Sequence, residues 1–159
     1  MRHIMVLTLL AAVALAGGAA ADGAVVHART PGAQWVSLSN GNGRAVVSRK
    51  GSFLILVGRG RIRVIDLPGG SRPNRSCNRR AIRVSSVATE YRGRGVRCHV
   101  FGQGPWQVVV RGFNIDGSGR VRGSLTLDAV NSGPTGRFSI GQRAARRWPR
   151  AARTFELRQ

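Results

Sequence analysis

An all-β domain with antiparallel strands is the fold that this sequence predicts, and three observations indicate it. Glycine pairs of the form Gly-x-Gly occur at 41–43, 58–60, 93–95, 102–104 and 117–119. Short runs rich in Val, Ile, Leu and Phe lie between these pairs, which is typical of an antiparallel sandwich or barrel. Polar and apolar residues alternate within several runs, and no long helical period follows residue 21.

The N-terminal segment, 1–21, has the composition of a signal peptide. Arg2 precedes an almost unbroken apolar run at 4–16, and three alanines at 19–21 provide a small-x-small cleavage site. This run is too short to cross a bilayer about 30 Å thick. We therefore expect export and no transmembrane span in the mature chain. An uncleaved membrane anchor is the alternative.

The mature part, 22–159, is predicted to be a single all-β domain. We expect strands at 34–39, 43–49, 52–57, 60–67, 81–89, 95–101, 105–111, 120–128, 136–140 and 153–157. Ile62 and Val64 alternate with Arg61 and Arg63, which predicts one buried and one exposed face. The run 53–57 is apolar throughout, which indicates a central strand covered on both faces. Residues 142–153 could form a short helix, limited by Pro149.

An internal repeat relates 41–67 to 102–128, with Gly41 matched to Gly102 and seven identities in the aligned stretch. Four of the repeated residues are glycines. Four glycine matches at the same offset arise by chance less readily than a single match. We therefore expect two related units of about 60 residues that share one core, joined by a polar loop at 68–80. The Gly-x-Gly pairs, including Gly117-Ser118-Gly119, are interpreted as hairpin turns with positive φ.

Three segments, 51–64, 119–128 and 136–141, resemble a group of secreted, glycine-punctuated β proteins from high-GC bacteria. The resemblance covers most of residues 41–141. It implies an exported all-β fold, and it attaches no activity and no functional residue to this chain.

Cys77 and Cys98 are the two cysteines of the chain, and after export they are predicted to form a disulfide. The bond would join the far end of the loop at 68–80 to the strand at 95–101. Two cysteines and the adjacent His99 are too few ligands for a metal site, so we expect neither a metal nor another cofactor.

The charge of the chain is strongly positive. Of 26 basic residues, 25 follow the signal together with all six acidic residues, so the mature chain carries a net charge of +19. Lys50 is the single lysine. GC-rich codons can explain arginine in place of lysine, but they do not explain the scarcity of carboxylates. Such a charge attracts polyanions. A merely solvated basic surface is the alternative.

Two rows of arginines are the candidate anion-binding residues. Arg59, Arg61 and Arg63 share one strand face, and Arg120 with Arg122 occupy the matching positions of the second unit. If the units pack with pseudo-symmetry, the two rows would form one basic strip. Guanidinium groups bind phosphate and carboxylate in bidentate fashion, which suits an anionic polymer. The alternative is an exposed face whose charge prevents edge-to-edge aggregation.

Catalytic motifs are weak in this sequence. A hydrolase of the two-carboxylate kind needs a facing pair, for which Asp66 and Asp128 are the candidates. No Gly-x-Ser-x-Gly elbow occurs, and His99 is the one histidine in the middle of the domain. We predict no catalytic residues, and an undiscovered hydrolase remains a distant alternative.

The sequence therefore predicts a non-catalytic module, secreted or at the cell surface, that binds anionic polymers. Its partners would be an anionic cell-wall polymer, an acidic glycan, a lipid surface or nucleic acid. The main alternative is a structural envelope protein that acts through protein–protein contact. The sequence gives no oligomeric state.

Overall fold

The computed structural model describes residues 32–129 and 135–157. Within these ranges the chain forms strands and no helix, so the predicted all-β antiparallel class is confirmed. The strands are β1 (Gln34–Asp66), β2 (Asn74–Cys77), β3 (Ile82–Arg83), β4 (Ala88–Asp128), β5 (Arg137–Ile140), β6 (Arg146–Arg147) and β7 (Arg153–Leu157). The predicted signal peptide at 1–21 lies outside the described residues. No helix in the described part is long and apolar enough to cross a membrane.

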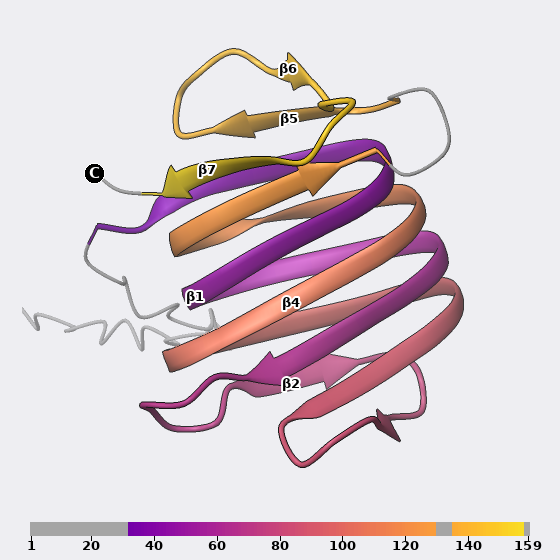
Figure 1. The fold of residues 1–159 in the computed structure, drawn as a ribbon, viewed down its shortest axis with the longest axis vertical. Helices are drawn as coiled ribbons and strands as arrows, with labels where there is room; N and C mark the ends of the chain where they lie inside the picture. The colour runs from indigo at the N-terminus through magenta and orange to yellow at the C-terminus, as the bar shows by residue number, and fades with distance from the viewer. Residues whose placement is uncertain (1–31, 130–134, 158–159) are drawn as a thin grey trace, which may run out of the picture.

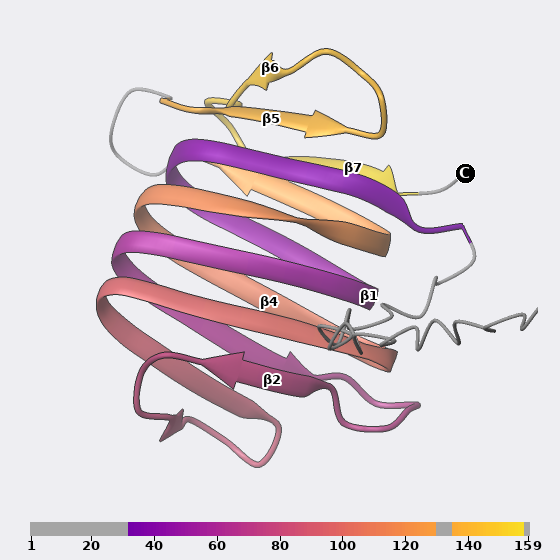
Figure 2. The same cartoon turned by 180° about the vertical axis from the view of Figure 1, so that it is seen from behind.

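Two very long strands, β1 and β4, dominate the molecule and run antiparallel to each other. Each strand coils, so that β1 pairs with β4 along both of its edges (Figures 1 and 2). Val47, for example, pairs with Val108 on one side and with Leu125 on the other. The segment of β4 between these two partners therefore makes one turn of the coil.

Glycines at positive φ allow these strands to bend without ending. Gly43, Gly60, Gly93 and Gly112 lie at one bend, which we call the glycine corner. Gly51, which also has a positive φ, pairs with Gly102 at a second bend about half a turn later, which we call the opposite corner. The prediction that glycine pairs end strands at hairpin turns was wrong. Even 117–119 lies inside β4, where Gly117 and Gly119 are buried in a continuous ladder and neither has a positive φ.

The alternation of buried and exposed residues breaks at the glycine corner. We call each stretch of β1 or β4 that lies beside its neighbours in the coil a pass. On three passes, two buried residues are separated by four consecutive residues that are not buried: between Val57 and Ile62, between Tyr91 and Val96, and between Val110 and Ile115. Strict alternation would turn one of two neighbouring positions inward. On these passes the glycine and both residues that flank it all remain unburied instead.

A single core fills the inside of the coil. Both long strands contribute large, fully buried side chains to it, such as Trp106, Phe53, Ile55 and Leu125. The run 53–57 is central in the sheet, as expected, but it is covered on one face, because Leu56 remains 36 % exposed. Within the part of the chain that the structure describes, the curved sheet closes around one core, and no second layer covers its outer face.

Short strands close the two ends of the coil. Strands β5, β6 and β7 lie at one end, and β2 lies at the other (Figure 1). The region predicted as a short helix instead contains β6 and the buried Trp148, whose indole nitrogen donates to the carbonyl oxygen of Asp128 at 3.3 Å. At the other end the predicted disulfide joins Cys77 of β2 to Cys98 of β4.

The predicted two-unit organisation is not confirmed. Residues 41–67 lie mainly in β1 and residues 102–128 lie in β4, so both segments belong to the same coiled ribbon. Because β1 and β4 run antiparallel, residues matched by the repeat do not occupy equivalent positions on successive turns of the coil. Gly51 lies at the opposite corner, whereas its repeat counterpart Gly112 lies at the glycine corner.

Candidate anion-binding site

The floor of the candidate site is a row of four glycines that crosses four neighbouring passes of the sheet. Gly43 pairs with Gly112, Gly112 with Gly60, and Gly60 with Gly93. A Cβ at Gly60 or at Gly112 would overlap a backbone carbonyl of the adjacent pass, so side chains are excluded there. The row is therefore a strip of bare backbone, which is accessible at Gly60, Gly93 and Gly112 and buried at Gly43.

Arginines flank this strip on one side and form the first wall. The cross-strand register places Arg111 beside Arg61 and Arg61 beside Arg92. Three neighbouring passes thus each contribute one guanidinium to the wall, at the strand spacing of about 4.8 Å. Arg44 lies beside Arg111 on the fourth pass and lines a smaller hollow next to the candidate site. Arg61, Arg92 and Arg111 are exposed.

The second wall lies on the other side of the glycines. Arg59 pairs with Arg94 on one neighbouring pass and with Phe113 on the other. Both arginines are exposed, and the Phe113 ring is 53 % exposed. Together the floor and the walls line a depression of about 610 Å³, which we call the corner groove. Among the described residues that line it, none is acidic.

Glu90 lies behind the first wall and is fully buried. Arg63 donates to its Oε2 at 2.8 Å, and Arg92 Nη2 makes an ion pair with Oε1 at 2.7 Å. Burial alone would raise the pKa of Glu90, but the hydrogen bond from Arg63 and the charge of Arg92 outweigh it. The pKa of this carboxyl therefore lies below its ordinary value, and Glu90 holds Arg92 at the rim of the groove as a carboxylate.

The structure brings together two of the predicted anion-binding residues, Arg59 and Arg61, which face each other across the floor. Arg63 is the next outward residue of the same strand and is held by Glu90. It lines the smaller hollow of about 300 Å³, which shares Arg61 and Arg111 with the corner groove.

Arg120 and Arg122 are not part of the corner groove. They pair with Ser52 and Lys50, next to Gly51 at the opposite corner. On β1 this corner is about half a turn of the coil away from Arg61. The two predicted rows therefore do not form one strip.

The sequence interpretation missed Arg92, Arg94, Arg111 and Phe113 as members of this site. A signal for the first two was present, because Arg-Gly-Arg occurs at 59–61 and again at 92–94. The register pairs the central glycines of these two triplets. Arg-Gly-Phe at 111–113 is the third member of the set, paired on the other edge of β1.

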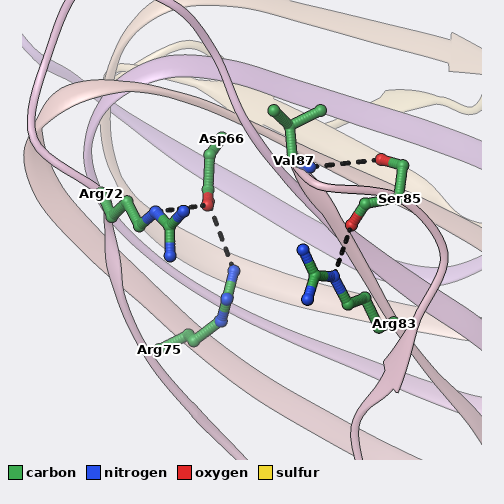
Figure 3. A network of polar contacts seen from close by, with 6 residues as sticks. All are labelled: Asp66, Arg72, Arg75, Arg83, Ser85 and Val87. Atoms are coloured by element: carbon green, nitrogen blue, oxygen red, sulfur yellow. Dashed lines mark hydrogen bonds and ion pairs between the residues drawn. The ribbon is translucent and has the colours of Figure 1, made fainter.

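The candidate carboxylate pair does not form a facing pair. Asp66 interacts with Arg75 at 3.3 Å and with Arg72 at 3.8 Å (Figure 3). The register separates it from Asp128 by three strand spacings across the sheet and five residues along the strand. With strands about 4.8 Å apart and about 3.3 Å per residue, this distance exceeds the reach of a two-carboxylate site.

A serine–histidine contact is present that the sequence did not reveal. Ser52 Oγ lies 2.7 Å from His99 Nε2, and the His99 ring tilts against Phe101. Such a contact is one element of a nucleophilic site, which also needs an orienting group and an oxyanion hole. The pair by itself therefore assigns no reaction. No group of three or more potential metal ligands occurs among the residues that the structure describes.

Comparisons with protein-family models, with curated proteins and with solved structures find no match to this chain. The geometry of the corner groove is therefore the basis on which a function can be argued.

Proposed function

We propose that this chain is a non-catalytic module, secreted or at the cell surface, that binds anionic polymers through the corner groove. The observation that carries the proposal is a set of like-charge pairs. Arg44 with Arg111, Arg111 with Arg61, Arg61 with Arg92, and Arg59 with Arg94 all lie directly opposite each other on neighbouring strands.

Like charges in this position destabilise a sheet by about 0.2–1 kcal/mol per pair. Arg44 also faces Asp128 on its other neighbouring strand, and Arg92 is paired with Glu90. Arg61, Arg111, Arg59 and Arg94 have no described ion pair, so their like-charge pairs at one bend depart from the charge alternation that favours stability. Departures of this kind concentrate at functional sites. An anionic polymer in the groove would remove the repulsion and would accept hydrogen bonds from several guanidinium groups.

The surroundings of the groove support the same ligand class. The net charge of +20 attracts polyanions from a distance, and the bare glycine floor admits a chain close to the backbone. The disulfide fits an oxidising compartment outside the cytoplasm. Cell-wall polymers, acidic glycans, anionic lipid surfaces and nucleic acid are the candidate partners there.

Substitution of Arg59, Arg61 and Arg94 by serine tests this proposal. These side chains are exposed, so the fold should tolerate the change. A matched control replaces three exposed arginines in the C-terminal part of the chain, outside the groove, and removes the same charge. These are Arg143, Arg147 and Arg150. We expect the groove variant to bind polyanions at least about tenfold more weakly than the control variant at moderate salt.

Affinity should be measured across a salt series, since each lost phosphate or carboxylate contact lowers the salt dependence. An equal loss in the two variants would mean that the net charge attracts polyanions without a site. That result would contradict the proposal, as would the absence of binding by the unaltered protein at moderate salt.

A further inference from the structure

We propose, resting on the function above, that the ligand of the corner groove is a linear acidic glycan with a carboxylate on each sugar. The chain would lie along the glycine row and would therefore run across the strands of the sheet. Guanidinium groups of both walls would hold its carboxylates, and Phe113 would pack against the face of one sugar ring.

The direction of the bound glycan chain follows from the register of the strands. The floor glycines cross four neighbouring passes and the first wall crosses three of them, so the groove extends about 14 Å perpendicular to the strands. A polymer along this line meets a guanidinium of the first wall once per strand spacing. One pyranose residue of an extended chain covers about the same distance as one strand spacing, about 5 Å.

Arginines on both walls fit the shape of such a chain. In an extended 1→4-linked uronate, successive sugars turn their carboxylates to opposite sides. Arg61 and Arg92 lie on one side of the floor, and Arg59 and Arg94 lie on the other. Each carboxylate can thus meet a guanidinium fork, which binds this planar group with two hydrogen bonds.

The floor and the aromatic residue distinguish a glycan from other polyanions. The floor at Gly60 and Gly112 is bare backbone, because a Cβ at either would overlap the adjacent pass, so a flat sugar ring can approach it closely. The exposed Phe113 ring offers an apolar surface to the C–H groups of a sugar face. Polyphosphate has no ring to use this surface.

Nucleic acid fits the groove less well. Proteins that bind single strands stack successive bases on several aromatic side chains. Phe113 is the one aromatic residue among the described residues that line this groove. A depression of about 610 Å³ suits a single narrow chain and is small for a duplex.

The test compares three oligomers of equal charge on the full chain: a 1→4-linked oligouronate, oligothymidylate and linear polyphosphate. Two variants accompany the unaltered protein. Phe113→Ala removes the aromatic ring of the groove, and Trp35→Ala removes an exposed aromatic ring that pairs with Arg120, outside the groove. Affinities are measured by calorimetry at moderate salt, and circular dichroism confirms that each variant is folded.

We expect the unaltered protein to bind the oligouronate at least about tenfold more tightly than the other two. Phe113→Ala should weaken oligouronate binding by about tenfold more than it weakens polyphosphate binding, whereas Trp35→Ala should change neither. Equal affinity for all three oligomers would overturn the glycan inference and would leave the proposed function intact. Tighter binding of oligothymidylate would also overturn it, in favour of nucleic acid. Binding of none of them would overturn both proposals.

Discussion

At the scale of single residues, Arg111 shows the conflict between stability and binding in this protein. It lies opposite Arg44 on one neighbouring strand and opposite Arg61 on the other, and no described ion pair offsets its charge. Arg111→Thr removes both repulsive pairs and introduces a residue that favours strands. We expect it to raise the free energy of unfolding by about 0.5 kcal/mol in urea at low salt.

The same variant should bind polyanions more weakly, because the first wall loses one guanidinium. The gain in stability should disappear as salt screens the repulsion. A loss of stability at low salt would mean that Arg111 is held by favourable contacts, and the like-charge argument would then fail.

Glu90 is the residue whose loss should affect both the fold and the groove. Its pKa is lowered from the ordinary value of 4.5 in the folded state. The stability contributed by its ion pairs is therefore fully present above about pH 4.5 and is lost as the pH falls through the lower folded pKa. Glu90→Gln should cost about 2 kcal/mol at pH 7 and should flatten the fall in stability on acidification.

Asp128→Asn removes a carboxylate that makes no described ion pair, and it serves as the control. Urea unfolding of both variants at pH 7 and at pH 3.5 separates the stability contributed by the ionised Glu90 from the effect of removing any carboxylate. Identical pH profiles for Glu90→Gln and the unaltered protein would show that Glu90 is not the titrating group.

At the scale of elements, the long strands depend on their bends. Gly51 has a φ of 126°, and a Cβ there would overlap the carbonyl oxygen of Arg120 on the next pass. Gly95 also has a positive φ, 58°, but a Cβ would meet nothing within 4 Å. Gly51→Ala should therefore destabilise the fold by at least about 2 kcal/mol more than Gly95→Ala, measured by denaturant unfolding. Equal effects would mean that the coil can widen at its corners.

Much of the strand content could be predicted, because alternation and apolar runs depend on local residue types. Ile62 and Val64 are buried and Arg61 is exposed, as expected from a period of two. The joining of these strands into β1 and β4 could not be predicted. Positive φ at a glycine serves a hairpin turn and a bend within a ladder equally well. Whether a glycine forms a turn or a bend depends on the neighbouring pass, which is distant in the sequence.

At the scale of the whole molecule, the coil explains why the candidate site was found in part. Arg59 and Arg61 follow from spacing along one strand. Arg92 and Arg111 join them because neighbouring passes of β4 lie on either side of β1. The internal repeat pointed instead to Arg120 and Arg122, and it relates strands that run in opposite directions. The relative direction of two strands cannot be read from a pattern within either strand.

The same architecture makes the groove a bridge between distant parts of the chain. Its floor residues Gly43, Gly60, Gly93 and Gly112 lie on four passes, two from each long strand. A polyanion in the groove contacts several passes at once, so it should stabilise the coil as a unit. At a free concentration one hundred times its Kd, binding adds about 2.7 kcal/mol, or roughly 8 °C in Tm.

Hydrogen exchange measures how this stabilisation is distributed. With an anionic oligomer bound, amides around all four floor glycines should exchange more slowly together, although these glycines are far apart in the sequence. The Arg59, Arg61 and Arg94 serine variant should lose both the protection and the rise in Tm while it keeps the unliganded exchange pattern. Protection confined to one pass would place the ligand along a strand, and the groove would then not be its site.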